Sequence, residues 1–159
     1  AVPNFLEAQQ RAKVSRVKAD MRTAATAVQS YAVDNNGFPW DFYKNGRDEW
    51  DTWNQITTPI SYLTSVPRDV FTEGDRQPYD YGAAVNRPNP AQQRAYYAAG
   101  FHYIFLSRGP NLDHEWNWTN NGNDGDGGNL LEVAYAVTYD PTNGSVSDGM
   151  IFRTMGGRP

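Results

Sequence analysis

Two stretches in the second half of the chain carry oxygen-bearing side chains of the kind that a hard metal ion needs. One is Asn111 to Glu115, and the other is Asn120 to Asn129, which consists only of Asn, Asp and Gly. Calcium takes about 6–8 oxygen ligands from carboxylates, amides and backbone carbonyls. The EF-hand pattern fails, because counting from Asn120 puts Leu131 where the bidentate glutamate belongs. Asn-Gly and Asp-Gly are also ordinary turn residues, so composition alone leaves a calcium loop and a plain polar loop both open.

The chain offers little for catalysis. Its two histidines are His102, which lies inside an expected strand, and His114, which has no second ligand at a metal-binding spacing. The sequence contains no nucleophile elbow, phosphate-binding loop or dinucleotide fingerprint. It also has no cysteine, which excludes disulfides and thiolate chemistry. We therefore predict that the protein is not an enzyme.

Charge and hydropathy bear on which partners and which class of protein are expected. The formal net charge of -4 and the pI of about 5.1 disfavour binding to a phosphate backbone, so nucleic acid is not an expected partner. No stretch reaches the roughly 18 apolar residues that a membrane-spanning helix needs. Hydrophobic residues make up 39% of the chain, which is enough for a core. A length of 159 residues fits one domain, which we place at residues 1–159.

The first expected element is a long helix over residues 1–35, clearest from Asn4 to Asp34. No Gly or Pro interrupts the run between Asn4 and Gly37, and apolar residues recur at spacings of three and four. This periodicity predicts one buried stripe, while five Lys and Arg residues between Arg11 and Arg22 occupy much of the remaining surface. The predicted packing face consists of Val14, Val17, Met21, Ala25 and Val28.

The rest of the chain predicts a small antiparallel sheet after an irregular middle region. Residues 36–95 lack clear periodicity, apart from a short helix expected within Ile56 to Leu63. Residues 96–159 hold the acidic Gly-rich loop and three expected strands, at Tyr96 to Leu106, Leu131 to Tyr139 and Met150 to Arg153. These elements predict an α+β fold, in which one long N-terminal helix packs on a small antiparallel β-sheet with long irregular loops.

Aromatic residues gather in two places, and they support an alternative function. One cluster runs from Trp40 to Trp53, and the other contains Trp116 and Trp118. Exposed rings would suit a carbohydrate- or protein-binding surface module, whereas buried rings would fill the small core. Buried tryptophans would therefore end the carbohydrate interpretation.

Several stretches resemble type IV pilins and the pseudopilins of type II secretion, most closely the major pseudopilins. They occur in family order, at Ala1 to Gln9, Lys18 to Thr23, Tyr31 to Pro39, Leu63 to Asp69 and Tyr139 to Gly149. The resemblance implies a pilin-like fold and a structural, self-assembling role in a pilus or pseudopilus filament that serves protein transport. The implied partners are copies of the chain, other pilin-like subunits, and the secretion or pilus assembly machinery of the inner membrane.

The family pattern also bears on where the native protein lies. Members carry an apolar helical half that passes directly into a sequence like Ala1 to Phe5, and this chain starts at Ala1 without a methionine. We expect the native chain to be anchored in the inner membrane through such a segment. The head domain is then periplasmic or extracellular, and the part that begins at Ala1 is expected to be soluble.

The resemblance raises the case for calcium. Major pseudopilins carry a calcium site in the loop after a strand similar to the one that leads into Asn111, which implies that Asn111 and Asp113 lie near the site. The Gly-Gly-Glu-Gly and Asp-Ala-Asp stretches of the family are not reproduced, and Asn120 to Asn129 takes their place. The expected ligands are Asn111, Asp113, Asp124 and Asp126.

Calcium binding has a direct test in thermal unfolding. A metal that binds only the folded chain raises its stability, so we expect a higher melting temperature with calcium than with a chelator. The melt is followed by circular dichroism on the same preparation. A melting temperature that does not change between the two conditions would remove the calcium site.

Overall fold

The long N-terminal helix is the largest element of the computed structural model. This helix, α1 (Val2–Asn35), has 34 residues and is therefore about 50 Å long. It ends where Asn36 adopts a left-handed φ of 52° and the Gly37 N–H donates to the Ala32 carbonyl at 3.2 Å. This closure satisfies a carbonyl of the last turn and turns the chain back toward the sheet. The predicted helix is confirmed.

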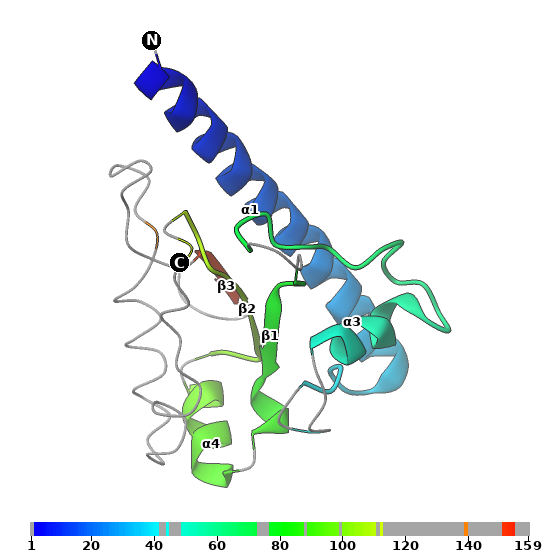
Figure 1. Cartoon of the computed structure of the whole chain (residues 1–159). Helices are drawn as coiled ribbons and strands as arrows, with labels where there is room; N and C mark the ends of the chain where they lie inside the picture. The colour runs from blue at the N-terminus through cyan, green and yellow to red at the C-terminus, as the bar shows by residue number, and fades with distance from the viewer. Residues whose placement is uncertain are drawn as a thin grey trace.

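The structure describes residues 2–41, 44, 49–72, 77–87, 89–98, 100–110, 112, 139 and 151–154. Within these residues, α1 crosses one face of a small sheet, and a shorter helix, α4 (Pro90–Ala98), lies beyond the sheet from α1 (Figure 1). The expected strand at Leu131 to Tyr139 falls outside the described residues, apart from Tyr139 itself.

The sheet has three antiparallel strands in the order β1-β2-β3. They are β1 (Asp80–Ala83), β2 (Tyr103–Ser107) and β3 (Ile151–Thr154). In the register, Tyr81 pairs with Phe105 on one side of β2, and Phe105 pairs with Arg153 on the other. The described elements thus form an α+β arrangement of helices and a small antiparallel sheet, as predicted.

Three boundaries differ from the prediction, and local chemistry explains each. The middle helix is α3 (Glu49–Thr57) rather than Ile56 to Leu63, because acidic residues fill its first turn and Pro59 disfavours helical backbone at the residue before it. The first strand, β1, lies at Asp80–Ala83, within the region expected to be irregular. Tyr96 belongs to α4 and not to a strand.

The start of α4 explains the misassigned Tyr96. The Asn89 side-chain oxygen accepts the Ala91 N–H at 2.8 Å, and Pro90 occupies the first helical position. Asn before Pro is a favourable helix start, because the amide caps a free N–H and proline needs no hydrogen-bonded N–H there. The strand starts only at Tyr103, after Gly100 with a φ of 82° has turned the chain.

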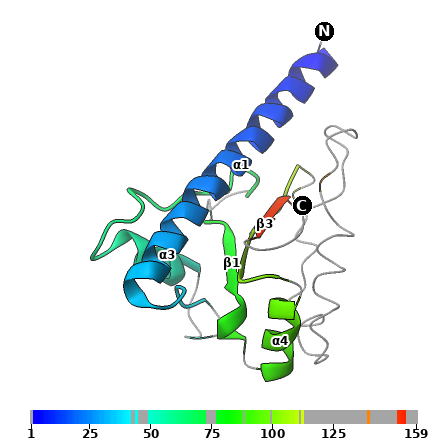
Figure 2. The ribbon, with the colours of Figure 1, turned by 180° about the vertical axis from the view of Figure 1, so that it is seen from behind.

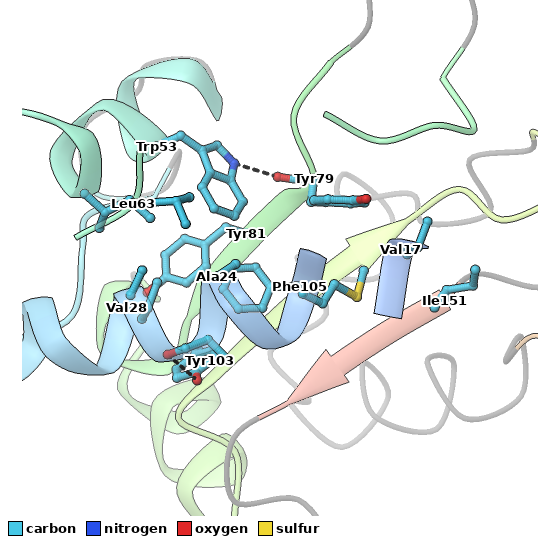
Figure 3. Close-up of a cluster of buried hydrophobic side chains, with 14 of the residues drawn as sticks. Val17, Ala24, Val28, Trp53, Leu63, Tyr79, Tyr81, Tyr103, Phe105 and Ile151 are labelled. Carbon is cyan, nitrogen blue, oxygen red and sulfur yellow. Dashed lines mark hydrogen bonds between the residues drawn. The ribbon is translucent and has the colours of Figure 1, made fainter. Parts of the chain in front are cut away.

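The main core lies between α1 and the sheet, and its centre is aromatic (Figure 3). Phe105 of β2 is 0% exposed, and its ring centroid lies 5.6 Å from Trp53, 5.4 Å from Tyr81 and 5.3 Å from Tyr103. The Trp53 indole N–H donates to the Tyr79 carbonyl at 2.8 Å, so the buried indole is satisfied. These contacts tie α3 and two strands together beneath α1.

A smaller core lies on the opposite face of the sheet. Ile104 and Leu106 of β2 point to this face and pack with Tyr96 and Phe101. Because residues of β2 alternate between two buried clusters, all five of its residues are buried. The central strand is therefore fixed from both sides, although the sheet is small.

A buried ion pair joins the segment after α1 to the end of β1. The Arg87 guanidinium lies 3.3 Å from the Asp41 carboxylate, and the two side chains are only 4% and 0% exposed. The same carboxylate accepts the Ala83 N–H at 2.9 Å, and the Arg87 guanidinium lies over the Tyr96 ring, 5.7 Å from its centroid. The pair links α1, the sheet edge and α4 through one charged contact.

The packing of α1 predicts a clear effect for a buried charge. We expect Val28→Lys to lower the free energy of unfolding by more than about 4 kcal/mol, because Val28 is 1% exposed and the ammonium would have no partner. Thr26→Lys places the same charge on the exposed side of the helix and should change stability by about 0.5 kcal/mol or less. Denaturant unfolding measures both, and equal effects would contradict the packing face.

Candidate interaction surface

The five residues of the predicted packing stripe all face the core. Val14, Val17, Met21, Ala25 and Val28 are between 0% and 6% exposed, and all belong to the main core. Their spacing places them on one side of α1, and this side lies over the sheet (Figure 3). The stripe therefore holds the helix in place on the sheet.

The amino-terminal turns of α1 project from the rest of the molecule (Figures 1 and 2). Residues 4–9 and 11–13 are exposed and Gln10 is half-buried, so the described chain covers little of this part of the helix. Two large apolar side chains lie here in solvent, with Phe5 63% and Leu6 53% exposed. We call residues 4–13 the arm. Because most of the stability of a helix in a protein comes from tertiary packing, an exposed part such as the arm receives little of that stabilisation.

A groove of about 780 Å³ runs along α1 next to the arm. One wall is the segment from Ala12 to Thr23 of α1, and the other is the chain from Leu63 to Thr72, which follows α3. We call this cavity the α1 groove. Charged and hydroxyl side chains dominate its lining, and the three cations are Lys13, Arg16 and Arg68.

Asp69 anchors the outer wall of the α1 groove to the sheet. Its carboxylate accepts the Ser107 hydroxyl at 2.9 Å, the Arg108 N–H at 3.0 Å and the Phe71 N–H at 3.0 Å. Burial raises the pKa of this carboxyl, and these three hydrogen bonds act in the opposite direction. The Leu63–Thr72 segment is thus fixed by a satisfied, buried carboxylate rather than left as a loose loop.

A second polar cavity, of about 300 Å³, lies on the far side of Asp69. Its lining includes the carboxylates of Glu49, Asp69 and Asp80, with Gln77 and Arg108 beside them. Burial is the largest cause that raises the pKa of Glu49, to about 8, and the charge of Asp80 adds to it. The N–H of Tyr81, which Glu49 accepts at 3.2 Å, acts against the shift.

These carboxylates do not amount to a metal site. Within the described residues, no three His, Asp or Glu side chains lie close enough together to hold an ion. The predicted calcium ligands Asn111, Asp113, Asp124 and Asp126 all lie outside the described residues, so calcium binding stays a prediction. No helix of the described part is both long and apolar enough to cross a membrane.

The tryptophans of the first aromatic cluster have different roles. Trp53 is 1% exposed and belongs to the core, so it offers no platform to a sugar. Trp50 is half-buried, and its indole N–H donates to the Gln77 side chain at 3.1 Å. Trp40 is 55% exposed and its ring points outward from a fixed backbone. Trp116 and Trp118 are not among the described residues.

The backbone of Trp40 is held by one side chain of α3. The Gln55 amide oxygen accepts the Trp40 N–H at 2.9 Å, and its amide nitrogen donates to the Trp40 carbonyl at 2.9 Å. This pair of bonds imitates the pairing of two strands and leaves the indole free to contact a partner.

His102 sits just before β2 and not inside a strand as expected. Its ring lies 5.5 Å from Tyr97 and 6.2 Å from Phe38, and its carbonyl accepts the Ala84 N–H at 2.9 Å. These contacts give His102 a place in the packing between α4 and the sheet. His114 lies outside the described residues.

Comparisons with models of protein families, with curated proteins and with solved structures find no match to this chain. The function is therefore inferred from the arrangement of the chain's own residues.

Sequence reasoning identified the stripe of α1 but not the α1 groove or the buried acids. The groove forms because the Leu63–Thr72 segment lies alongside α1, and no local sequence pattern predicts that path. For the acids, a weak sign was present, since Tyr79, Tyr81 and Ala83 alternate as a strand around Asp80.

The raised pKa of Glu49 predicts how stability depends on pH. The folded chain holds this proton more tightly than the unfolded chain, so the contribution of Glu49 is full below about pH 4.5 and is lost as the pH rises through about 8. Glu49→Gln removes this titration. As the pH rises from about 4.5 to about 8, we therefore expect the melting temperature of the variant to rise relative to that of the wild type. Thermal melts at several pH values measure the difference.

Glu7→Gln is the matched control, because Glu7 lies on the exposed part of α1. Its melting temperature should follow that of the wild type at each pH. Parallel curves for wild type and Glu49→Gln would show that this carboxyl titrates normally and would contradict the prediction.

Proposed function

We propose that this chain is a structural subunit of a pilin-like filament, a pilus or pseudopilus that assembles from copies of itself. The observation that carries the proposal is the arm, the uncovered amino-terminal part of α1 that projects beyond the sheet with Phe5 and Leu6 in solvent. Exposed apolar side chains on a projecting helix favour a protein partner. The residues that resemble pseudopilins point to type II secretion as the system it serves.

The division of α1 into two parts suits this role. Residues from Val14 onward supply the buried apolar side chains that fix the helix on its own sheet, whereas no side chain of residues 4–13 belongs to the main core. Docking the arm of one copy against the body of another joins two different surfaces. Repetition of such a contact by a rotation that does not close generates a helical filament.

The proposal includes partners and a location. Its partners are copies of the chain, other pilin-like subunits, and the assembly machinery of the inner membrane. We propose that the native protein is anchored in that membrane and that the head domain is periplasmic or extracellular. The fold proposed for the head is pilin-like, which agrees with a long helix across a small antiparallel sheet.

A surface module that binds carbohydrate or protein is the second candidate. The exposed ring of Trp40, on a backbone held by Gln55, favours it. The burial of Trp53 argues against an extended aromatic platform of the kind that sugar rings stack on. Among the described tryptophans Trp40 alone is exposed, which fits a protein contact better and is compatible with a filament subunit.

Filament membership can be tested by labelling, because the chain has no cysteine of its own. Arg94→Cys introduces one thiol on the exposed side of α4, in the body of the molecule. In cells that make the native protein, we expect maleimide-gold to decorate filaments at regular intervals in electron micrographs. Ile56→Cys, at a position only 1% exposed, is the control that should not label. Filaments without label, or label on isolated molecules alone, would contradict the proposal.

A further inference from the structure

Two of the cations in the α1 groove lie over aromatic rings. The Lys13 ammonium lies 5.9 Å from the centroid of the Phe71 ring, and the Arg68 guanidinium lies 5.1 Å from that of Trp50. In the described part of the chain neither side chain forms an ion pair, and both are exposed. An aromatic ring holds a cation in position without neutralising its charge. The two cations are therefore presented to the solvent of the groove.

The two carboxylates of the groove, those of Asp20 and Asp69, already accept hydrogen bonds from other residues of the chain. Asp69 is 2% exposed, and its oxygens accept hydrogen bonds from Ser107 of β2 and from the Arg108 N–H. Asp20 accepts the Tyr79 hydroxyl at 3.0 Å and lies 3.7 Å from Arg16, so its charge is shared between two donors. What the groove offers a ligand is a positive lining.

The groove also offers hydroxyl donors. Thr64 and Ser65 line it and are exposed, and among the described contacts neither hydroxyl makes a hydrogen bond. Cations with neighbouring hydroxyls suit a carboxylate ligand, which accepts charge-assisted hydrogen bonds on both oxygens. A volume of about 780 Å³ leaves room for several side chains of a peptide segment.

From this geometry we infer that the α1 groove binds an acidic segment of a second copy of the chain. The inference rests on the proposed function and names a contact within the filament. Charge complementarity selects the occupant. Residues 1–22 hold five Lys and Arg against two Asp and Glu, whereas residues 23–159 hold nine against sixteen. The basic helix of one copy and the acidic body of the next therefore attract each other.

The test is self-association of the chain, measured by sedimentation equilibrium at about 50 mM and about 500 mM salt. We expect Lys13→Glu with Arg68→Glu to weaken association about ten-fold or more at low salt, because each substitution turns attraction into repulsion. High salt should weaken the wild type in the same way. A wild type that stays monomeric at low salt would overturn the inference.

The matched control is Lys44→Glu with Arg94→Glu, which makes the same change of charge at exposed positions outside the groove. It should associate nearly as well as the wild type. Equal weakening in the two double variants would show a general attraction between charges and would overturn the groove assignment. Should the groove variant unfold, Lys13→Gln with Arg68→Gln removes the cations without adding acids, and we expect it to lose association as well.

Two further outcomes separate this inference from the proposed function. Normal filaments from the groove variant would overturn the inference and leave the filament role in place, whereas labelled wild-type cells without filaments would count against the role itself.

Titration with a polyaspartate peptide examines other occupants. A peptide that binds the wild type but not the groove variant, while self-association is unchanged, would assign the groove to a different acidic partner and overturn the second-copy inference.

Discussion

The structure depends on the contact between the apolar stripe of α1 and the aromatic face of the sheet. The chain has no disulfide to replace this contact, since its sequence contains no cysteine. Phe105 lies at the middle of the contact, fully buried among rings from α3 and the strands, and α1 closes the cluster from above. Both the arm and the α1 groove owe their positions to it, because each is built on the same rigid helix.

One helix thus performs two tasks that need opposite surfaces. Val14 is buried while its neighbour Lys13 faces the groove, and this change of side between consecutive residues follows from the helical period of 3.6. Any movement of α1 on the sheet would shift the arm and the groove together. The positions of the arm and the α1 groove are therefore coupled through the packing of α1 on the sheet.

The helix α1 and its buried face could be predicted from the sequence, because the spacing of apolar residues by three and four is sustained over many turns. A few exceptions such as Gln10 do not hide the stripe. Shorter elements were less certain. The aromatic run from Tyr96 onward has the composition of a strand, yet the cap at Asn89 starts a helix there and the strand follows Gly100. The α1 groove could not be predicted, and the acids around Glu49 left only a weak sign in the sequence, since both arise where segments distant in sequence meet.

The bonds between Gln55 and Trp40 have a consequence for how this surface can evolve. Gln55 binds the peptide groups of residue 40 and not its ring, so the fold can hold this position with any residue other than proline, which lacks the N–H. Because more than half of the indole is exposed, its replacement removes little packing. Position 40 can therefore accept other residues at small cost to folding, so the fold does not determine which side chain this end of the molecule presents to solvent.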